Sequence, residues 1–330
     1  MGRMGREDEF NGGMLFLLSR QMQGIQKMNK ATASPLVTVG IPVYNESARI
    51  VDCIRSVQAQ TYPNIEICIS DNCSSDGTYE LARQLAEESS NIRLVRQERN
   101  MGALANFGSV RRMAGGEYFM WLGSDDRILP TYIEKMVEQL EAHPRAAVAQ
   151  SAVLRINERG KVLQEVKYRD TFDQDRDGPL TQAMRALTPK RSARRMKLNL
   201  YVYGLFRKSI IDGIGGEEAV LCGDRVLPAL AALSGGLRYV EEPLFIKRVR
   251  LKKRSPDDPA LVERLNRRRV ANIVWWVLRC PIIPFWRRWY GLIIVFPFMV
   301  ERAKKTIKVA LPRPIRRMLK HILSWVGASS

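Results

Sequence analysis

The chain has 330 residues and a net charge of +19, and 45% of its residues are apolar. This apolar share excludes an intrinsically disordered chain and is sufficient for a packed core. Five scattered cysteines without a Cys-x-x-Cys pair, and only two histidines, argue against a zinc site or a disulfide framework. Free thiols are typical of a reducing cytosol.

The positive charge is concentrated at the C-terminal end. From Lys247 onward there are 21 Lys and Arg against 4 Asp and Glu, a net charge of +17, so residues 1–246 carry only +2. Strongly basic modules bind anionic surfaces. We therefore expect a flexible tail over 1–34, with Met28 as a candidate start, a folded domain over 35–250 and a basic helical extension over 251–330.

The first half of the domain alternates strands with helices. Apolar runs predict strands at 36–43, 65–69, 92–95 and 118–122. Apolar residues at helical spacing predict helices from 50, from 78, over 103–113 and from 133. This alternation predicts a mostly parallel, doubly wound α/β sheet flanked by helices, in which ligands bind beyond the carboxyl ends of the strands.

The second half of the domain is less regular. We expect a hairpin with its turn at 157–160, a polar mobile loop over 167–199, a strand over 201–206, a helix over 224–234, and closing strands over 237–240 and 244–249. A linker follows at 252–259, and no internal repeat is visible.

The first acidic cluster follows the predicted strand at 65–69. Asp71 stands at the strand end, where an ionised carboxylate accepts a hydrogen bond from the N3–H of a uracil-like base. Asp76 and Gly77 lie in the same turn before Thr78. For Asp76 a purely structural alternative stays open, since Asp-Gly forms turns and Thr caps helices.

The second acidic cluster, Asp125-Asp126, follows the predicted strand at 118–122. Mg²⁺ or Mn²⁺ binds one or two carboxylates and fills its other positions with phosphate oxygens and water. Two adjacent carboxylates repel each other without a cation, which favours a metal site over a solvated turn. Between the two clusters, Asn100 and Gly102 open the helix at 103–113 and allow close approach of a diphosphate.

Four segments together resemble the successive signatures of family 2 glycosyltransferases. They are 38–46 (TVGIPVYNE), 70–78 (SDNCSSDGT), 100–102 (NMG) and 121–126 (WLGSDD), and the resemblance covers roughly 35–250. It implies the GT-A fold, a nucleotide-diphospho-sugar donor, a divalent metal and inversion at the sugar carbon.

The resemblance also implies roles for individual residues. Pro42, Tyr44 and Glu46 would border the nucleoside, Asp71 would bind the base, and Asp125 would ligate the metal with Asp126 beside it. The first acidic position of the D-x-D motif is Gly123 here, and the late histidine of the family has no counterpart between His143 and His321.

Asp224 matches the acidic residue that acts as the base in this family. An inverting transfer needs such a base to take the proton of the acceptor hydroxyl. The alternative is a helix N-terminal Asp stabilised by the helix dipole. Arg248, after the closing strand, is a further candidate for the diphosphate, and a solvated arginine is the alternative.

The basic C-terminal quarter combines Trp, Arg and short apolar stretches interrupted by proline. No stretch reaches the about 20 apolar residues of a spanning helix. This composition predicts peripheral or monotopic attachment at the cytoplasmic face of the plasma membrane. Helical packing on the domain and a hairpin partly entering the bilayer remain alternatives, and no nucleic acid is expected as a partner.

The sequence therefore favours transfer of a sugar from a UDP- or dTDP-sugar to a lipid-linked saccharide, as in the synthesis of cell-surface polysaccharide or glycolipid. A second enzymatic alternative is transfer to polyprenyl phosphate, which is already an anion and does not require Asp224. The non-enzymatic alternative is a membrane- or nucleic-acid-binding protein on a degenerate nucleotide fold.

Overall fold

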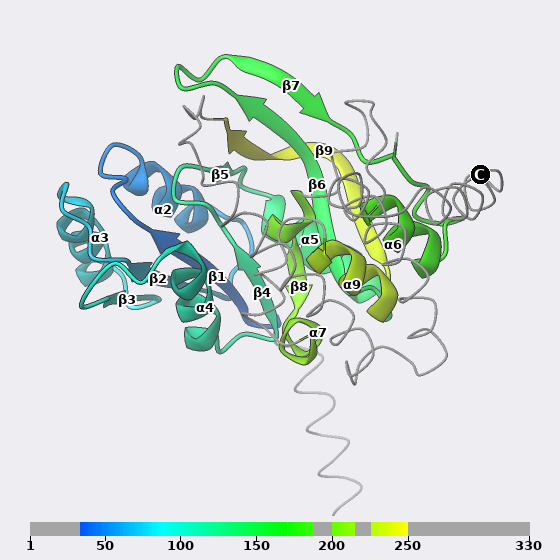
Figure 1. The fold of residues 1–330 in the computed structure, drawn as a ribbon, viewed down its shortest axis with the longest axis horizontal. Coiled ribbons are helices and arrows are strands. Elements are labelled where there is room, and N and C mark those ends of the chain that lie inside the picture. The colour runs from blue at the N-terminus through cyan, green and yellow to red at the C-terminus, as the bar shows by residue number, and fades with distance from the viewer. Residues whose placement is uncertain (1–33, 170, 188–199, 215–225, 250–330) are drawn as a thin grey trace, which may run out of the picture.

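The computed structural model describes residues 34–169, 171–187, 200–214 and 226–249 (Figure 1). The predicted tail at 1–34, apart from its last residue, the basic extension at 251–330 and Asp224 lie outside the described residues. Within the described part, no helix is both long and apolar enough to cross a membrane.

The N-terminal half alternates strands and helices as expected. Its elements are β1 (Val37–Val43), α2 (Ile50–Gln58), β2 (Ile65–Asp71), α3 (Thr78–Glu87), β3 (Ile92–Arg96), α4 (Ala103–Met113) and β4 (Tyr118–Trp121). β1 is buried along its whole length, because helices cover both faces of the sheet. Its apolar residues therefore continue without the alternation of a half-exposed strand.

Strand order brings the two acidic clusters to one edge of the sheet. β1 pairs in parallel with β2 on one side and with β4 on the other, and β3 pairs in parallel with β2. The order of the strands therefore reverses after β3. Because parallel crossovers are right-handed, α4 covers the face opposite to α2 and α3. Such a reversal opens a crevice at the carboxyl ends of the strands.

The C-terminal half adds strands of both directions. Its elements are β5 (Arg127–Ile128), α5 (Tyr132–Ala142), β6 (Val148–Ile156), β7 (Val162–Val166), α6 (Pro179–Leu187), β8 (Leu205–Arg207), α7 (Lys208–Gly213), α9 (Val226–Ser234) and β9 (Leu237–Arg248). One nine-stranded sheet results, in the order β3-β2-β1-β4-β8-β6-β9-β5, with β7 on β6. The expected α/β class with flanking helices is confirmed, and each antiparallel pair of the described strands includes a strand of this half.

Three expectations for the second half were wrong. The closing strands expected at 237–240 and 244–249 form the single strand β9. The segment 167–199 is not one loop, because Pro179–Leu187 forms α6, which packs against α9. The segment 201–206 is not one strand: Tyr201 lies in a short 3₁₀ turn, and only Leu205–Arg207 pair with neighbouring strands. Tyr201 is buried and its ring contacts that of Tyr168. The apolar residues that predicted a strand here are therefore apolar because they pack in the core, not because they pair in a strand.

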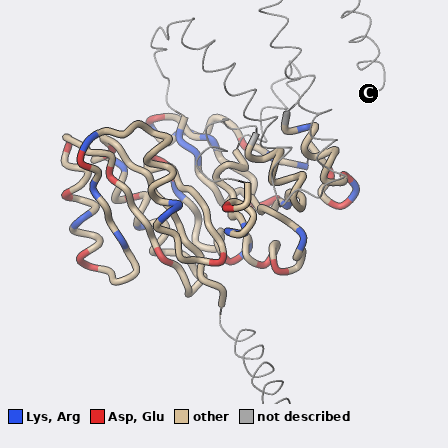
Figure 2. Tube along the Cα trace, turned by 60° about the horizontal axis from the view of Figure 1, so that its bottom comes forward, with Lys and Arg blue, Asp and Glu red and all other residues tan. Residues whose placement is uncertain are grey.

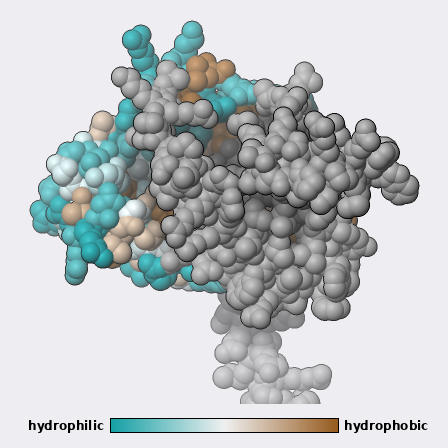
Figure 3. All heavy atoms as spheres, viewed as in Figure 1, coloured by the Kyte–Doolittle hydropathy of each residue, from teal (hydrophilic) through white to brown (hydrophobic). Residues whose placement is uncertain are grey.

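The surface of the described part is mixed in charge. Basic and acidic positions are interspersed along the chain trace, and the visible face near α3 is mostly hydrophilic (Figures 2 and 3). An apolar patch lies where β7 begins, since Val162 and Leu163 are 54% and 56% exposed.

Candidate active site

The loops after β1 and β2 are joined by side-chain hydrogen bonds. The backbone N–H of Glu46 donates to the Thr78 hydroxyl at 2.8 Å, and the N–H of Ser47 donates to Oδ2 of Asp76 at 3.0 Å. The N–H of Asn45 donates to the hydroxyl of Ser74 at 3.0 Å. Asp76 thus has the structural role that its turn chemistry predicted, and it fixes the two strand ends relative to each other.

Asp71 is the buried carboxylate at the end of β2, with no exposed side-chain surface. Its Oδ2 accepts the N–H of Ser74 at 3.0 Å and lies 3.8 Å from Nε of Arg96. Its Oδ1 is buried and has no hydrogen-bond partner among the described residues. Because an unsatisfied buried carboxylate oxygen is costly, this oxygen is suited to a ligand that brings a donor.

A network of side-chain amides shapes the loop before α4. Nδ2 of Asn72 donates to Oδ1 of Asn100 at 2.8 Å, and the N–H of Met101 donates to Oδ1 of Asn72 at 2.8 Å. The N–H of Gly102 donates to the same Asn100 oxygen at 2.9 Å. Gly102 has a φ of +83°, which favours glycine at this position.

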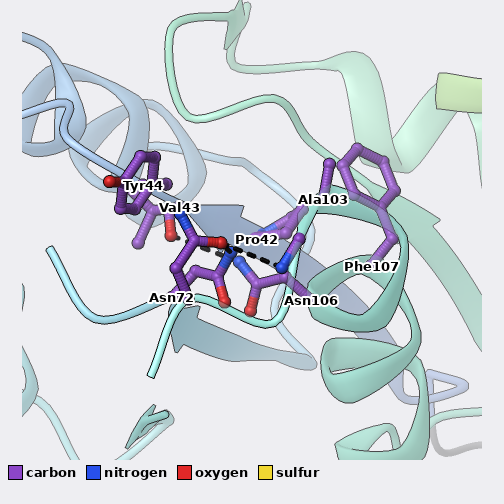
Figure 4. A pocket seen from close by; sticks show the side chains of 9 residues that line it. Pro42, Val43, Tyr44, Asn72, Ala103, Asn106 and Phe107 are labelled. Atoms are coloured by element: carbon purple, nitrogen blue, oxygen red, sulfur yellow. Dashed lines mark hydrogen bonds between the residues drawn. The ribbon is translucent and has the colours of Figure 1, made fainter. Parts of the chain in front are cut away.

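A pocket of about 280 Å³ lies between this loop, the end of β1 and the start of α4 (Figure 4). Tyr44 and Phe107 flank it, and the amides of Asn72 and Asn106 lie between them. Nδ2 of Asn106 donates to the carbonyls of Val43 and Ser70, whereas its buried Oδ1 has no partner among the described residues. Its full lining is Pro42, Val43, Tyr44, Asn72, Asn100, Gly102, Ala103, Asn106 and Phe107.

The second acidic cluster lies in the loop between β4 and β5. Asp125 is partly exposed, whereas Asp126 is 1% exposed. Oδ2 of Asp126 lies 2.5 Å from Nζ of Lys247, and its Oδ1 accepts the backbone N–H of Arg248 at 3.0 Å. Both oxygens of Asp126 are therefore engaged by the end of β9.

The pKa values of this pair follow from burial and from the opposite charge. Burial is the largest influence on Asp126 and raises its pKa to about 6. Burial disfavours the charge on Lys247, but the Asp126 carboxylate outweighs it and raises the pKa of Lys247 above its ordinary value. Each group therefore stabilises the charged form of the other. Burial and the nearby carboxylates also raise the pKa of the Cys53 thiol, which donates to the carbonyl of Gly123.

The two carboxylates fit a divalent cation differently. Across the described residues, no group of three or more His, Cys, Asp or Glu is placed to hold a metal. Asp125 fits a site in which one carboxylate is completed by phosphate oxygens and water. Asp126 fits it less well, because a cation would have to displace the ammonium of Lys247.

Arg248 contacts the turn between β6 and β7. Its Nη1 donates to the carbonyls of Asn157 and Glu158 at 3.1 and 2.9 Å. The Nε of Arg248 is buried and has no partner in the described part of the chain. Arg248 therefore holds the hairpin to the loop of Asp126, and its predicted contact with a diphosphate is untested.

The structure gathers some of the predicted site residues and separates others. Pro42, Tyr44, Asn100 and Gly102 line one pocket. Glu46, Asp71, Asp125 and Arg248 are not among its lining residues, and Glu46 is buried with Oε2 3.6 Å from Arg49. Sequence reasoning pointed to Asn106 as an amide at the start of the helix, but it missed the basic partners Arg96 and Lys247 and the amide of Asn72. A signal existed for Asn72, which directly follows Asp71, and for Lys247, a charge at the end of an apolar strand.

Comparison with known proteins gives a consistent result. The model of the family described as "Glycosyl transferase family 2" matches residues 38–200. Curated relatives include the putative teichuronic acid biosynthesis glycosyltransferase TuaG of Bacillus subtilis, 36% identical over 32% of this chain and 41% of the relative. Glycosyltransferase GlyG of Streptococcus pneumoniae is 32% identical over 33% of this chain and 36% of the relative. The alignment thus spans less than half of either relative.

Among solved structures, residues 1–349 of TarS from S. aureus align with a TM-score of 0.57 and 15% identity, over 79% of this chain and 70% of that chain. A structure of the same protein in complex with UDP-GlcNAc aligns with a TM-score of 0.57 over 77% of this chain and 69% of that chain. At this identity the likeness establishes the GT-A fold.

Proposed function

This chain belongs to glycosyl transferase family 2, and on that premise we propose that it is an inverting enzyme that transfers a sugar from a UDP- or dTDP-sugar to a saccharide hydroxyl. Both named relatives are glycosyltransferases, and the name of TuaG supports a role in polysaccharide synthesis. The choice of nucleotide rests on one observation, the open and buried Oδ1 of Asp71.

The hydrogen bonds of Asp71 favour a base with a single donor. An ionised carboxylate only accepts, and Oδ2 already accepts the N–H of Ser74. One oxygen therefore remains, which matches the lone N3–H of uracil or thymine. Guanine presents two neighbouring donors, N1–H and N2–H, and these would need both carboxylate oxygens. The pocket beside Tyr44, Asn100 and Gly102 lies at the same edge of the sheet and would hold an adjoining part of the donor.

A divalent cation, Mg²⁺ or Mn²⁺, would be held by Asp125 together with the donor. When bound, it stabilises the negative charge that develops on the leaving diphosphate. Glu46 would border the nucleoside, and Arg248 would approach the diphosphate only after its guanidinium leaves the hairpin turn. These assignments follow the family motifs, and Glu46 lies three residues after the end of β1, outside the lining of the pocket.

Asp224 remains the proposed base, and the acceptor remains a lipid-linked saccharide at the cytoplasmic face of the plasma membrane. The support is the position of Asp224 before α9 and the net charge of +17 from Lys247 onward, which suits an anionic membrane. Asp224→Asn should abolish transfer while donor binding persists. Normal turnover of this variant on a lipid-linked saccharide would show that Asp224 is not the base.

Binding of nucleoside diphosphates to Asp71→Asn tests the nucleotide assignment. The introduced amide would keep its carbonyl on the N–H of Ser74 and turn its NH₂ group toward the base. This group opposes the N3–H of uracil but donates to the unprotonated N3 of cytosine. We expect UDP affinity to fall about 10- to 100-fold, because a mismatched buried hydrogen bond costs about 1–3 kcal/mol, and CDP to become the better ligand.

Calorimetric titration of the full chain with UDP, CDP and GDP measures this change. Asp76→Asn is the matched control, because Asp76 lies in the same loop but is exposed. The Asp76→Asn variant should prefer UDP to the same degree as the wild type. Tighter binding of GDP than UDP to the wild type, or an unchanged preference in Asp71→Asn, would contradict the proposal.

A further inference from the structure

The ion pair between Asp126 and Lys247 occupies the place where the second acidic cluster was expected to bind a cation. The Asp126 side chain is fully buried, and Lys247 is 18% exposed. Nζ of Lys247 lies 2.5 Å from Oδ2 of Asp126 and 4.0 Å from the ring centroid of Tyr203. The ammonium thus has a carboxylate and an aromatic face as partners, and both hold it in place.

Gly123 belongs to the same arrangement. A Cβ atom at this position would lie 2.5 Å from Oδ2 of Asp126 and 3.4 Å from Oδ1 of Asp125. The space that a side chain at the first position of the D-x-D motif would enter is therefore filled by the carboxylate of Asp126. Gly123 and Lys247 thus act on the same oxygen of Asp126, since a Cβ at position 123 would clash with it and the ammonium of Lys247 pairs with it.

Further contacts hold the backbone that carries Asp125. The N–H of Asp126 donates to the carbonyl of Gly123 at 2.8 Å, and the Cys53 thiol donates to the same carbonyl at 3.5 Å. Immediately after the loop, β5 pairs with β9, the strand that ends in Lys247 and Arg248. Asp125 therefore extends from a loop that is held on both sides, and it is partly exposed whereas Asp126 is not.

We propose that Lys247 is a positioning residue of the donor site: it keeps Asp126 away from the cation and holds the loop so that Asp125 alone meets it. This inference rests on the proposed function. A single carboxylate binds Mg²⁺ or Mn²⁺ weakly, and phosphate oxygens complete the coordination. The cation therefore binds this protein together with the donor diphosphate and not before it.

Titration of the full chain with Mn²⁺, followed by the paramagnetic resonance signal of free Mn²⁺, tests the proposal. Without nucleotide, the wild type should bind Mn²⁺ only in the millimolar range, and UDP should tighten this binding at least tenfold. Lys247→Met frees Asp126 to act beside Asp125, so Mn²⁺ affinity without nucleotide should rise at least tenfold. Adding Asp126→Asn to Lys247→Met should return the affinity to the wild-type value.

Two results would overturn the proposal. One is a wild type that binds Mn²⁺ without nucleotide and loses this binding in Asp126→Asn. The other is a folded Lys247→Met variant with wild-type Mn²⁺ affinity. If Lys247→Met does not fold, the Asp126→Asn and Asp125→Asn variants test the proposal instead. In the presence of UDP, the Mn²⁺ affinity of Asp126→Asn should stay within about threefold of the wild-type value, whereas Asp125→Asn should no longer bind Mn²⁺. An equal loss in both variants would refute the role given to Lys247.

The proposed function can fail separately. If UDP does not bind the wild type with or without Mn²⁺, the nucleotide assignment is wrong. The nucleotide-free titrations of Lys247→Met and of its double variant still show whether Lys247 controls the access of a cation to Asp126.

Discussion

The two acidic clusters use the same residue type at the same edge of the sheet in opposite ways. Asp71 and Asp126 are both buried carboxylates beyond a strand end, and each faces a basic side chain from another strand. Arg96 lies 3.8 Å from Asp71 and leaves Oδ1 open, whereas Lys247 lies 2.5 Å from Asp126 and Arg248 takes the second oxygen. The partners, rather than the carboxylates themselves, decide which of the two buried carboxylates can accept a ligand.

Each cluster also contains a second carboxylate with the complementary role. In the first cluster the exposed Asp76 joins two loops and the buried Asp71 keeps an open oxygen. In the second cluster the buried Asp126 holds the loop, and the partly exposed Asp125 extends from it. Burial therefore marks the ligand-facing carboxylate in one cluster and the structural one in the other.

The largest expected difference is in stability. Removing one partner of a buried ion pair costs about 3–5 kcal/mol, and a pair with one exposed partner, held at 3.8 Å, contributes less. Lys247→Met should therefore lower the free energy of unfolding far more than Arg96→Met, because Arg96 is 41% exposed and Asp71 keeps the N–H of Ser74. Urea denaturation of both variants measures the difference. Equal losses would show that the two pairs are energetically alike.

Gly123→Asp should destabilise the protein less than Lys247→Met does. The family motif suggests that this substitution would strengthen metal binding, but the packing around Gly123 predicts that it will not. It completes D-x-D in sequence, yet its Cβ would lie 2.5 Å from Oδ2 of Asp126. Overpacking of this kind costs about 1–3 kcal/mol, and a third carboxylate adds repulsion. We expect a lower melting temperature and no gain in Mn²⁺ affinity. Ser124→Ala in the same loop is the control, and a stabilised Gly123→Asp variant would refute the packing argument.

Local patterns predicted the first half of the fold closely. The apolar run at 36–43 became β1, and the helix expected at 103–113 is α4 to the residue. Asp71 could likewise be placed, since it directly ends a strand. The structure of the second half is set by tertiary packing that local sequence patterns do not reveal. Tyr201 is in the core without forming a strand, and the polar segment before residue 188 contains α6.

The pairing of Asp126 could not be predicted, because Lys247 is 121 residues away in the chain. Adjacent Asp residues at a strand end have the same local sequence whether they face a cation or an ammonium. The distinguishing signal was the combination of Gly123 with Lys247, and only the alignment of β5 with β9 brings these two positions together.

The smallest expected effect concerns Asp76 and acid stability. Burial disfavours its charge, but the Thr78 hydroxyl and the backbone N–H groups of Ser47 and Thr78 outweigh burial and lower the pKa to about 2. Because the folded-state pKa lies below the unfolded value, the stabilisation is complete above about pH 4 and is lost as the pH falls toward 2. Asp76→Asn should therefore be less stable than wild type by under about 1 kcal/mol at pH 5, since Asp76 is exposed. Urea denaturation from pH 5 to pH 2 should show this gap closing, whereas a constant gap would mean that the carboxylate charge does not hold the two loops together.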